Sequence, residues 1–213
     1  MRVIICTHKA DIDGLFSASV ALMKFPQSSI SFYDYGVKSF KEMFEYIKCE
    51  SKKTTGGLAI ISDLGINDKT IFSLFEETIQ YLKKRHWSVI WVDHHPWDRK
   101  LLKSARKYAK LFLNSTGKKC ATEIMYEKFM YKNKIAKQLK LIAHSSDFMT
   151  NLKNHDSRLS ELIHYYRISE NSRQNLESLV EKASRGILWD SDMQSEYTKF
   201  IKISDFQKKE SLK

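Results

Sequence analysis

The chain has 213 residues, of which 42% are apolar, 12% aromatic and 29% charged. This composition suits a globular protein with its own core and excludes disordered and collagen-like chains. Lysine and arginine total 36 against 25 acidic residues. The resulting net charge of +11 favours a polyanionic partner, with nucleic acid as the leading candidate.

Three cysteines, at positions 6, 49 and 120, form no CxxC pair and are odd in number. They indicate neither a disulfide framework nor a thiolate zinc site. The apolar run at the N-terminus stops at His8, and no stretch approaches the roughly 18 apolar residues of a membrane span. We therefore expect a cytoplasmic protein with no membrane partner.

Short β-branched runs alternate with helical patterns in the first half of the chain. The runs cover residues 3–6, 30–33, 58–61 and 89–92, and a fifth covers residues 110–113. Between them, apolar residues recur at helical spacing, as at Phe40, Phe44 and Ile47. This alternation predicts an α/β fold with a mostly parallel five-stranded sheet flanked by helices.

From about residue 121 onward the periodicity is helical, and no strand is predicted there. The polar stretch 150–157 is the best boundary. It divides the chain into a first domain over residues 1–150 and a helical C-terminal extension over residues 151–213. The extension contains an amphipathic helix that can cover the core, dimerise or bind a partner, and we favour the core. Its apolar positions are Leu176, Leu179, Val180 and Ala183.

Positive charge is concentrated between residues 99 and 140, which hold 13 basic and two acidic residues. A solvated helical face is one explanation, and a phosphate-binding surface is the other if phosphate chemistry occurs nearby. Trp97, just before this segment, is a candidate for stacking on a base. The candidate contacts to nucleic acid are Arg99, Lys100, Lys103, Arg106, Lys107, Lys118 and Lys119.

Acidic residues and histidines follow three of the predicted strands. The groups are His8, Asp11 and Asp13, then Asp63, then Asp93, His94 and His95. The carboxyl ends of parallel strands meet at one edge of a sheet, so these groups are expected to converge. Each alone has a structural explanation; Asp13, for example, can cap a helix that begins near Gly14. Their occurrence together favours a common site.

Packed carboxylates repel one another, and divalent cations relieve that cost. Oxygen ligands with few imidazoles suit Mn²⁺ or Mg²⁺ better than zinc, and a shared carboxylate can hold two ions about 3.5–4 Å apart. That spacing is used for the attack of water on phosphorus. The residues therefore indicate hydrolysis of a phosphodiester or phosphoanhydride.

The order of these residues resembles the motifs of the DHH phosphoesterase superfamily. The matching pattern is His8-x-x-Asp11-x-Asp13-Gly14, then Asp63, then Asp93-His94-His95. The segments Cys120 to Glu123 and Leu141 to Asp147 resemble the parts of the family that complete its site. The resemblance covers residues 1–150 and points to the RecJ-like single-strand nucleases of archaeal type.

The resemblance implies two Mn²⁺ ions, with Mg²⁺ as the alternative metal, and a role for each residue. The implied ligands are His8, Asp11 and Asp63 for one ion, and Asp13, Asp63, His94 and Asp147 for the other. Asp63 would bridge the two ions. In the implied catalytic set of Asp63, Asp93 and His95, Asp93 orients an imidazole and His95 faces the scissile phosphate.

RecJ-like members carry a second, glycine-rich domain, and residues 151–213 do not resemble it. Either that domain lies elsewhere, or the basic segment or another partner binds the substrate. We expect a Mn²⁺-dependent phosphodiesterase that degrades single-stranded DNA or RNA as a RecJ-like exonuclease in repair or replication, with a helicase or replisome protein as partner. The alternatives are a non-catalytic replisome or repair scaffold, and a phosphodiesterase for oligonucleotides or cyclic dinucleotides.

Overall fold

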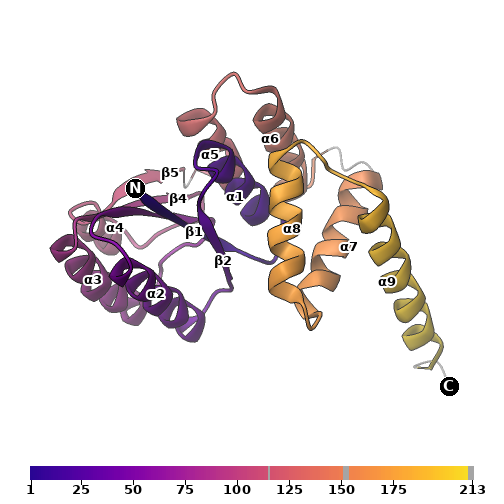
Figure 1. Ribbon diagram of the computed structural model, residues 1–213, viewed down its shortest axis with the longest axis horizontal. Helices are drawn as coiled ribbons and strands as arrows, with labels where there is room; N and C mark the ends of the chain where they lie inside the picture. The colour runs from indigo at the N-terminus through magenta and orange to yellow at the C-terminus, as the bar shows by residue number, and fades with distance from the viewer. Residues whose placement is uncertain (115, 151–153, 211–213) are drawn as a thin grey trace.

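A parallel five-stranded sheet organises the first half of the chain in a computed structural model that describes residues 1–114, 116–150 and 154–210 (Figure 1). The strand order is β2-β1-β3-β4-β5, and every neighbouring pair is parallel. The strands are β1 (Arg2–His8), β2 (Ser29–Tyr33), β3 (Gly57–Ser62), β4 (Trp87–Asp93) and β5 (Lys110–Leu113). This arrangement confirms the predicted α/β fold.

Helices cover both faces of the sheet, as parallel connections require. One face carries α2 (Val37–Lys52), α3 (Lys69–Lys84) and α4 (Arg99–Ala105), and the other carries α1 (Ile12–Lys24), α5 (Ala121–Phe129) and α6 (Lys134–Asp147). Phe44, Phe75 and Trp91 form the centre of the first layer, where Phe75 meets Trp91 edge to face at 5.4 Å. The apolar spacing that predicts these helices is therefore the spacing of the buried side chains.

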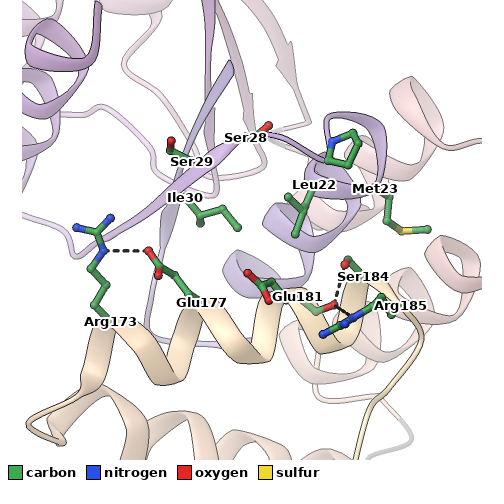
Figure 2. Close-up of a pocket in the computed structure, with 11 residues that line it drawn as sticks. Leu22, Met23, Ser28, Ser29, Ile30, Arg173, Glu177, Glu181, Ser184 and Arg185 are labelled. Carbon is green, nitrogen blue, oxygen red and sulfur yellow. Dashed lines mark hydrogen bonds and ion pairs between the residues drawn. The ribbon is translucent and has the colours of Figure 1, made fainter. Parts of the chain in front are cut away.

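Three further helices lie beyond α1: α7 (Asn154–Ile168), α8 (Ser172–Ser184) and α9 (Ser191–Glu210) (Figure 1). α8 packs against α1, and the four apolar positions predicted for it are buried in the same core as α1 and α5. Figure 2 shows α8 running past the end of α1 and the start of β2, with Arg173 and Glu177 paired at 2.9 Å on its surface. Core packing is thus the observed use of this apolar face.

The predicted boundary between residues 150 and 151 adjoins residues 151–153, which lie outside the described residues, and the division into two domains stays a prediction. Among the helices that the structure describes, none combines the length and apolar composition needed to cross a bilayer.

The register of the central strands sets the level of the side chains that follow them. Thr7 in β1 lies opposite Ser62 in β3, and Ser62 lies opposite Val92 in β4. The residues one step further along the three strands are therefore neighbours, and these are His8, Asp63 and Asp93. The backbone amide of Asp63 still donates to the Val92 carbonyl at 2.9 Å, but Asp63 has a φ of 58° and turns the chain away from the sheet.

Candidate metal centre

Two aspartates at the start of α1 point in different directions. Asp11 is the N-cap of α1, and its Oδ1 accepts a hydrogen bond from the Gly14 amide at 2.9 Å. Asp13, which the sequence suggested as the cap, instead lies inside the first turn and reaches across to α5. Its carboxylate accepts from the amides of Ala121 at 2.7 Å and Thr122 at 2.8 Å. The alternative explanation, that Asp13 only caps its own helix, does not hold because Asp11 fills that position.

The start of α5 holds Asp13 by backbone donors that have no partner inside their own helix. The Thr122 hydroxyl also donates to the Asp13 carbonyl at 2.9 Å. Cys120, the N-cap, is buried, and burial raises the pKa of its thiol. These contacts hold the Asp13 side chain in one orientation.

A buried hydroxyl network lies directly beneath these residues. The Ser17 hydroxyl donates to Ser62 Oγ at 2.8 Å, and Ser62 Oγ donates to Thr7 Oγ1 at 3.0 Å. All three side chains are fully buried. The network ties α1 to the ends of β1 and β3, and the sequence analysis did not identify it because three short polar residues far apart carry no shared pattern.

His8 stands between two carboxylates. Its Nδ1 lies 3.1 Å from Asp11 Oδ2 and 3.4 Å from Asp63 Oδ2. Side-chain atoms of these three residues lie within 4.8 Å of one another, as donors to a single cation must. This group matches the first set of ligands that the family resemblance implies.

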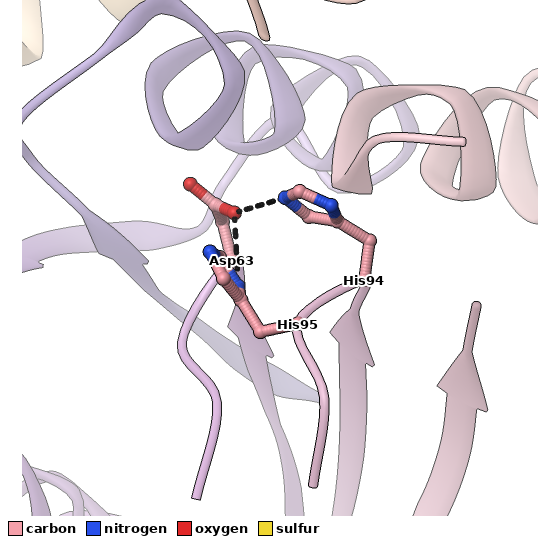
Figure 3. A group of neighbouring side chains, drawn as sticks. All are labelled: Asp63, His94 and His95. Atoms are coloured by element: carbon pink, nitrogen blue, oxygen red, sulfur yellow. Dashed lines mark ion pairs between the residues drawn. The ribbon is translucent and has the colours of Figure 1, made fainter. Parts of the chain in front are cut away.

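His94 lies between three carboxylates, those of Asp13, Asp63 and Asp147. Its Nε2 lies 3.4 Å from Asp63 Oδ1 and 3.6 Å from Asp13 Oδ2. Its Nδ1 lies 3.7 Å from the Oδ2 of Asp147, the last residue of α6. Figure 3 shows Asp63 reaching from the end of β3 toward the imidazoles of His94 and His95 beyond β4.

Asp63 is central because each of its two oxygens faces a different histidine. Three buried atoms at this point have no hydrogen-bond partner within the described chain: His8 Nδ1, Asp63 Oδ1 and His94 Nε2. Buried polar atoms without partners are costly and uncommon. Nitrogen and carboxylate oxygen are metal ligands, so the residues present fit two divalent cations with Asp63 between them.

The carboxylates and imidazoles of the site shift one another's pKa. Burial raises the pKa of Asp63, the charge of Asp13 raises it further, and the result is about 7. Burial lowers the pKa of His8, but the carboxylates of Asp11 and Asp63 outweigh this and raise it to about 10. Burial and neighbouring carboxylates oppose each other in the same way at His94, whose pKa rises to about 9. Protons therefore occupy the position that a cation would take, since metal binding displaces them.

Asp93 and His95 form a second layer beside the cluster. Asp93 is fully buried; its Oδ1 lies 2.7 Å from His95 Nδ1, and its Oδ2 accepts from the indole of Trp97 at 2.7 Å. His95 keeps one third of its side chain exposed. The indole of Trp97 is buried and edge to face with Trp91 at 5.3 Å, so it does not stack on a base as the sequence analysis suggested.

Tyr35, after β2, belongs to the site although the sequence analysis did not select it. Its hydroxyl donates to the Asp63 carbonyl at 3.3 Å and lies 3.1 Å from a ring nitrogen of His95. Its ring is 4.9 Å from that of His8. β2 carries no acidic motif, so the available signal was only that a residue directly after a parallel strand reaches the same edge.

The predicted nucleic-acid contacts lie on both sides of β5. Arg99 and Lys100 open α4 near the carboxyl ends of the strands, whereas Arg106 and Lys107 follow α4 toward the start of β5, which is level with Ile90 in the middle of β4. Lys103 lies between them. Lys118 and Lys119 return to the site edge just before Cys120, and Lys119 pairs with Glu127 at 2.7 Å. Whether these residues bind nucleic acid stays a prediction.

The fold and the site together define a class of protein. An open parallel sheet with carboxylates and imidazoles gathered at its carboxyl edge is the arrangement of a metal-dependent hydrolase. Residues 2–150 match the family model described as DHH family, N-terminal domain. The chain belongs to the DHH family, whose members are metal-dependent phosphoesterases.

The chain is also similar in structure to a solved protein. The crystal structure of an uncharacterized protein from Helicobacter pylori G27 superposes with a TM-score of 0.67 and 18% sequence identity. The likeness covers 95% of this chain and 62% of the Helicobacter pylori chain, so this chain spans less than two thirds of the length of that protein. At this identity the comparison shows the fold alone. None of the curated proteins matches the chain.

Proposed function

We propose that this protein is a Mn²⁺-dependent phosphodiesterase of the RecJ-like type that degrades single-stranded nucleic acid. The observation that supports it most is the convergence of two histidines and four aspartates around three buried atoms that make no hydrogen bond within the described residues. Such a site relieves its charge by binding cations. The proposed ligands are His8, Asp11, Asp13, Asp63, His94 and Asp147.

Each residue has a proposed task in hydrolysis. Two divalent cations would neutralise the phosphate and lower the pKa of the attacking water. Asp63 separates the two cation positions, and the start of α5 fixes Asp13. His95, oriented by Asp93, is exposed enough to donate a hydrogen bond to the scissile phosphate. The indole of Trp97 donates a hydrogen bond to Asp93 and holds its carboxylate in position.

The proposed substrate follows from charge. Arg99, Lys100, Lys118 and Lys119 lie toward the same edge of the sheet as the aspartates, where they can neutralise phosphates on either side of the site. From the resemblance to RecJ-like nucleases, we also propose a role in repair or replication, with a helicase or replisome protein as partner.

Digestion of end-labelled DNA and RNA tests this function. Single strands labelled at the 5′ or the 3′ end are incubated with Mn²⁺, Mg²⁺ or EDTA, using the wild type, Asp63→Asn and Asp192→Asn. Asparagine tolerates the left-handed backbone at position 63, so that variant should fold. Asp192 has a largely exposed side chain and serves as the control.

We expect Mn²⁺-dependent laddering that falls at least 100-fold in Asp63→Asn and is unchanged in Asp192→Asn. Salt-sensitive binding of single strands should persist in Asp63→Asn, because phosphate contacts and metal ligands are different residues. Full cleavage by Asp63→Asn, or cleavage in EDTA, would contradict the proposed site.

A second candidate is a phosphodiesterase for short oligonucleotides or cyclic dinucleotides. The ion pair of Lys119 with Glu127 favours it, because a short substrate needs fewer free basic side chains around the site. Measuring the rate on strands of 2, 5, 15 and 30 nucleotides separates the two. A rate that rises with length supports the exonuclease, and a maximum at two nucleotides supports the short-substrate enzyme.

A further inference from the structure

A hollow adjoins the metal centre on the side of α2 and α3. Its volume is about 520 Å³, within the range of small-molecule sites. It is formed where three segments leave the sheet: the turn after β2, the turn before α3 and the turn after β4. His95 and Tyr35 line it. The Nδ1 of His95 also lies 3.8 Å from Asp63 Oδ1, and the hydroxyl of Tyr35 donates to the Asp63 carbonyl. The hollow is thus continuous with the candidate metal centre.

Its walls are largely apolar, although it lies at the most polar edge of the molecule. Val37, Ile71 and Pro96 line it together with the ring of Tyr35. Val37 is 41% exposed and Tyr35 is 43% exposed. Two exposed apolar or aromatic side chains beside a site for phosphate are unexpected unless a ligand covers them, because nothing in the site's proposed metal chemistry requires them.

Polar groups stand at the rim of the same hollow. α2 begins at Val37, and its N-cap, Gly36, provides no side chain to bond the first amides of the helix. Asn67 holds the Asp98 amide with its Oδ1 at 2.9 Å, which leaves its amide NH₂ as a donor. The hollow therefore combines apolar walls, an aromatic ring and a few hydrogen-bond donors.

We propose that this hollow, named the Val37 pocket after its exposed wall, binds the nucleobase of the nucleotide whose phosphate lies at the metal centre. A base is flat and apolar on its faces, and has acceptor atoms on its edge, which matches the walls and the rim. A phosphate fits the pocket poorly, because the Asp68 carboxylate lines it and its one basic side chain, His95, is already paired with Asp93. The proposal deepens the phosphodiesterase function and rests on it for the position of the phosphate.

Binding of mononucleotides tests the pocket without requiring turnover. Calorimetry in Mn²⁺ compares adenosine 5′-monophosphate and adenosine 3′-monophosphate with ribose 5-phosphate, which lacks the base. We expect one of the two nucleotides to bind at least tenfold more tightly than ribose 5-phosphate. Equal affinities for all three would overturn the proposal.

Val37→Asp places a charge on the apolar wall. An acidic residue in the first turn of a helix is favourable, so the variant should fold. The matched control is Ile187→Asp, which makes the same change in charge at a side chain that is 39% exposed and does not line the pocket. The preference for the nucleotide over ribose 5-phosphate should fall to less than threefold in Val37→Asp and stay intact in Ile187→Asp. Retention of the preference in Val37→Asp would refute the pocket.

Hydrolysis of a short oligonucleotide with and without a terminal abasic residue separates the two proposals. If the nucleotide preference depends on Val37 but neither oligonucleotide is hydrolysed, the pocket stands and the phosphodiesterase function falls. If both are hydrolysed at equal rates and the nucleotides show no preference, the phosphodiesterase function stands and the pocket falls.

Discussion

Replacing Gly14 by alanine sets two physical effects against each other at the start of α1. Alanine favours a helix over glycine by about 1 kcal/mol, so propensity alone predicts that Gly14→Ala stabilises the protein. A Cβ at this position, however, would lie 2.2 Å from the His8 carbonyl oxygen and 2.9 Å from the carbonyl carbon. These are backbone atoms at the end of β1 and cannot rotate away.

The structure sets the size of the disturbance. Ordinary contact begins near 3.4 Å, so α1 must move away from His8 by about 1 Å. Overpacking of this kind costs about 1–3 kcal/mol and outweighs the gain in helix propensity. The movement also separates His8, at the end of β1, from Asp11 and Asp13 on α1. Ligands for one metal centre therefore lose their common geometry.

We expect Gly14→Ala to lower the melting temperature by about 2–4 °C for each kcal/mol of net destabilisation. Calorimetry should show at least tenfold weaker Mn²⁺ binding at a temperature where both proteins are folded. The control is Gly56→Ala, at the opposite edge of the sheet, where φ is +83° and the nearest atom to a Cβ is 3.7 Å away. It should lose stability from backbone strain but keep its Mn²⁺ affinity. A Gly14→Ala protein with unchanged stability and Mn²⁺ affinity would refute this reasoning.

Three further changes follow from single contacts. Trp97→Phe removes the 2.7 Å hydrogen bond to Asp93. This variant should reduce turnover on single strands at least tenfold, while Mn²⁺ affinity changes less than threefold. A larger loss of Mn²⁺ affinity would place Asp93 among the metal ligands. Glu50→Gln breaks the ion pairs that the buried Glu50 carboxylate makes with Arg2 and Lys53 near the surface. Burial raises the pKa of Glu50, but Lys53 and Arg2 together have the larger effect, and the pKa is lowered. The ionised carboxylate therefore stabilises the folded protein above pH 4.5, and this stabilisation is lost as the pH falls below that value. The melting temperatures of wild type and Glu50→Gln should thus differ at pH 7 and converge toward pH 3, and a constant difference would argue for a packing effect. Leu179→Ala, in α8, should cost about 2–5 kcal/mol in urea denaturation, whereas less than 1 kcal/mol would mean that α8 is not part of the main core.

Local sequence was sufficient for the sheet. β5 has the bounds predicted from its pattern, and the other four strands extend the predicted runs by one to three residues. Such runs are readable because a strand buried on both faces is apolar throughout and ends where polar residues begin. The same polar residues are the DHH motifs, since parallel strands bring their carboxyl ends to one edge. Fold class and candidate ligands are for this reason the part of the molecule that the sequence by itself determined.

Long-range contacts were decided only by the tertiary structure. Asp13 faces α5 instead of its own helix because Asp11 occupies the N-cap, and Tyr35 joins the site because β2 ends beside His8. Trp97 looks like an exposed aromatic residue in sequence, but the Asp93 carboxylate holds its indole inside the core. Lys119 looks like a free basic side chain in sequence, but Glu127 of α5 pairs with it at 2.7 Å. Each of these outcomes depends on which residues far apart in sequence become neighbours, and a local pattern of side chains does not contain that information.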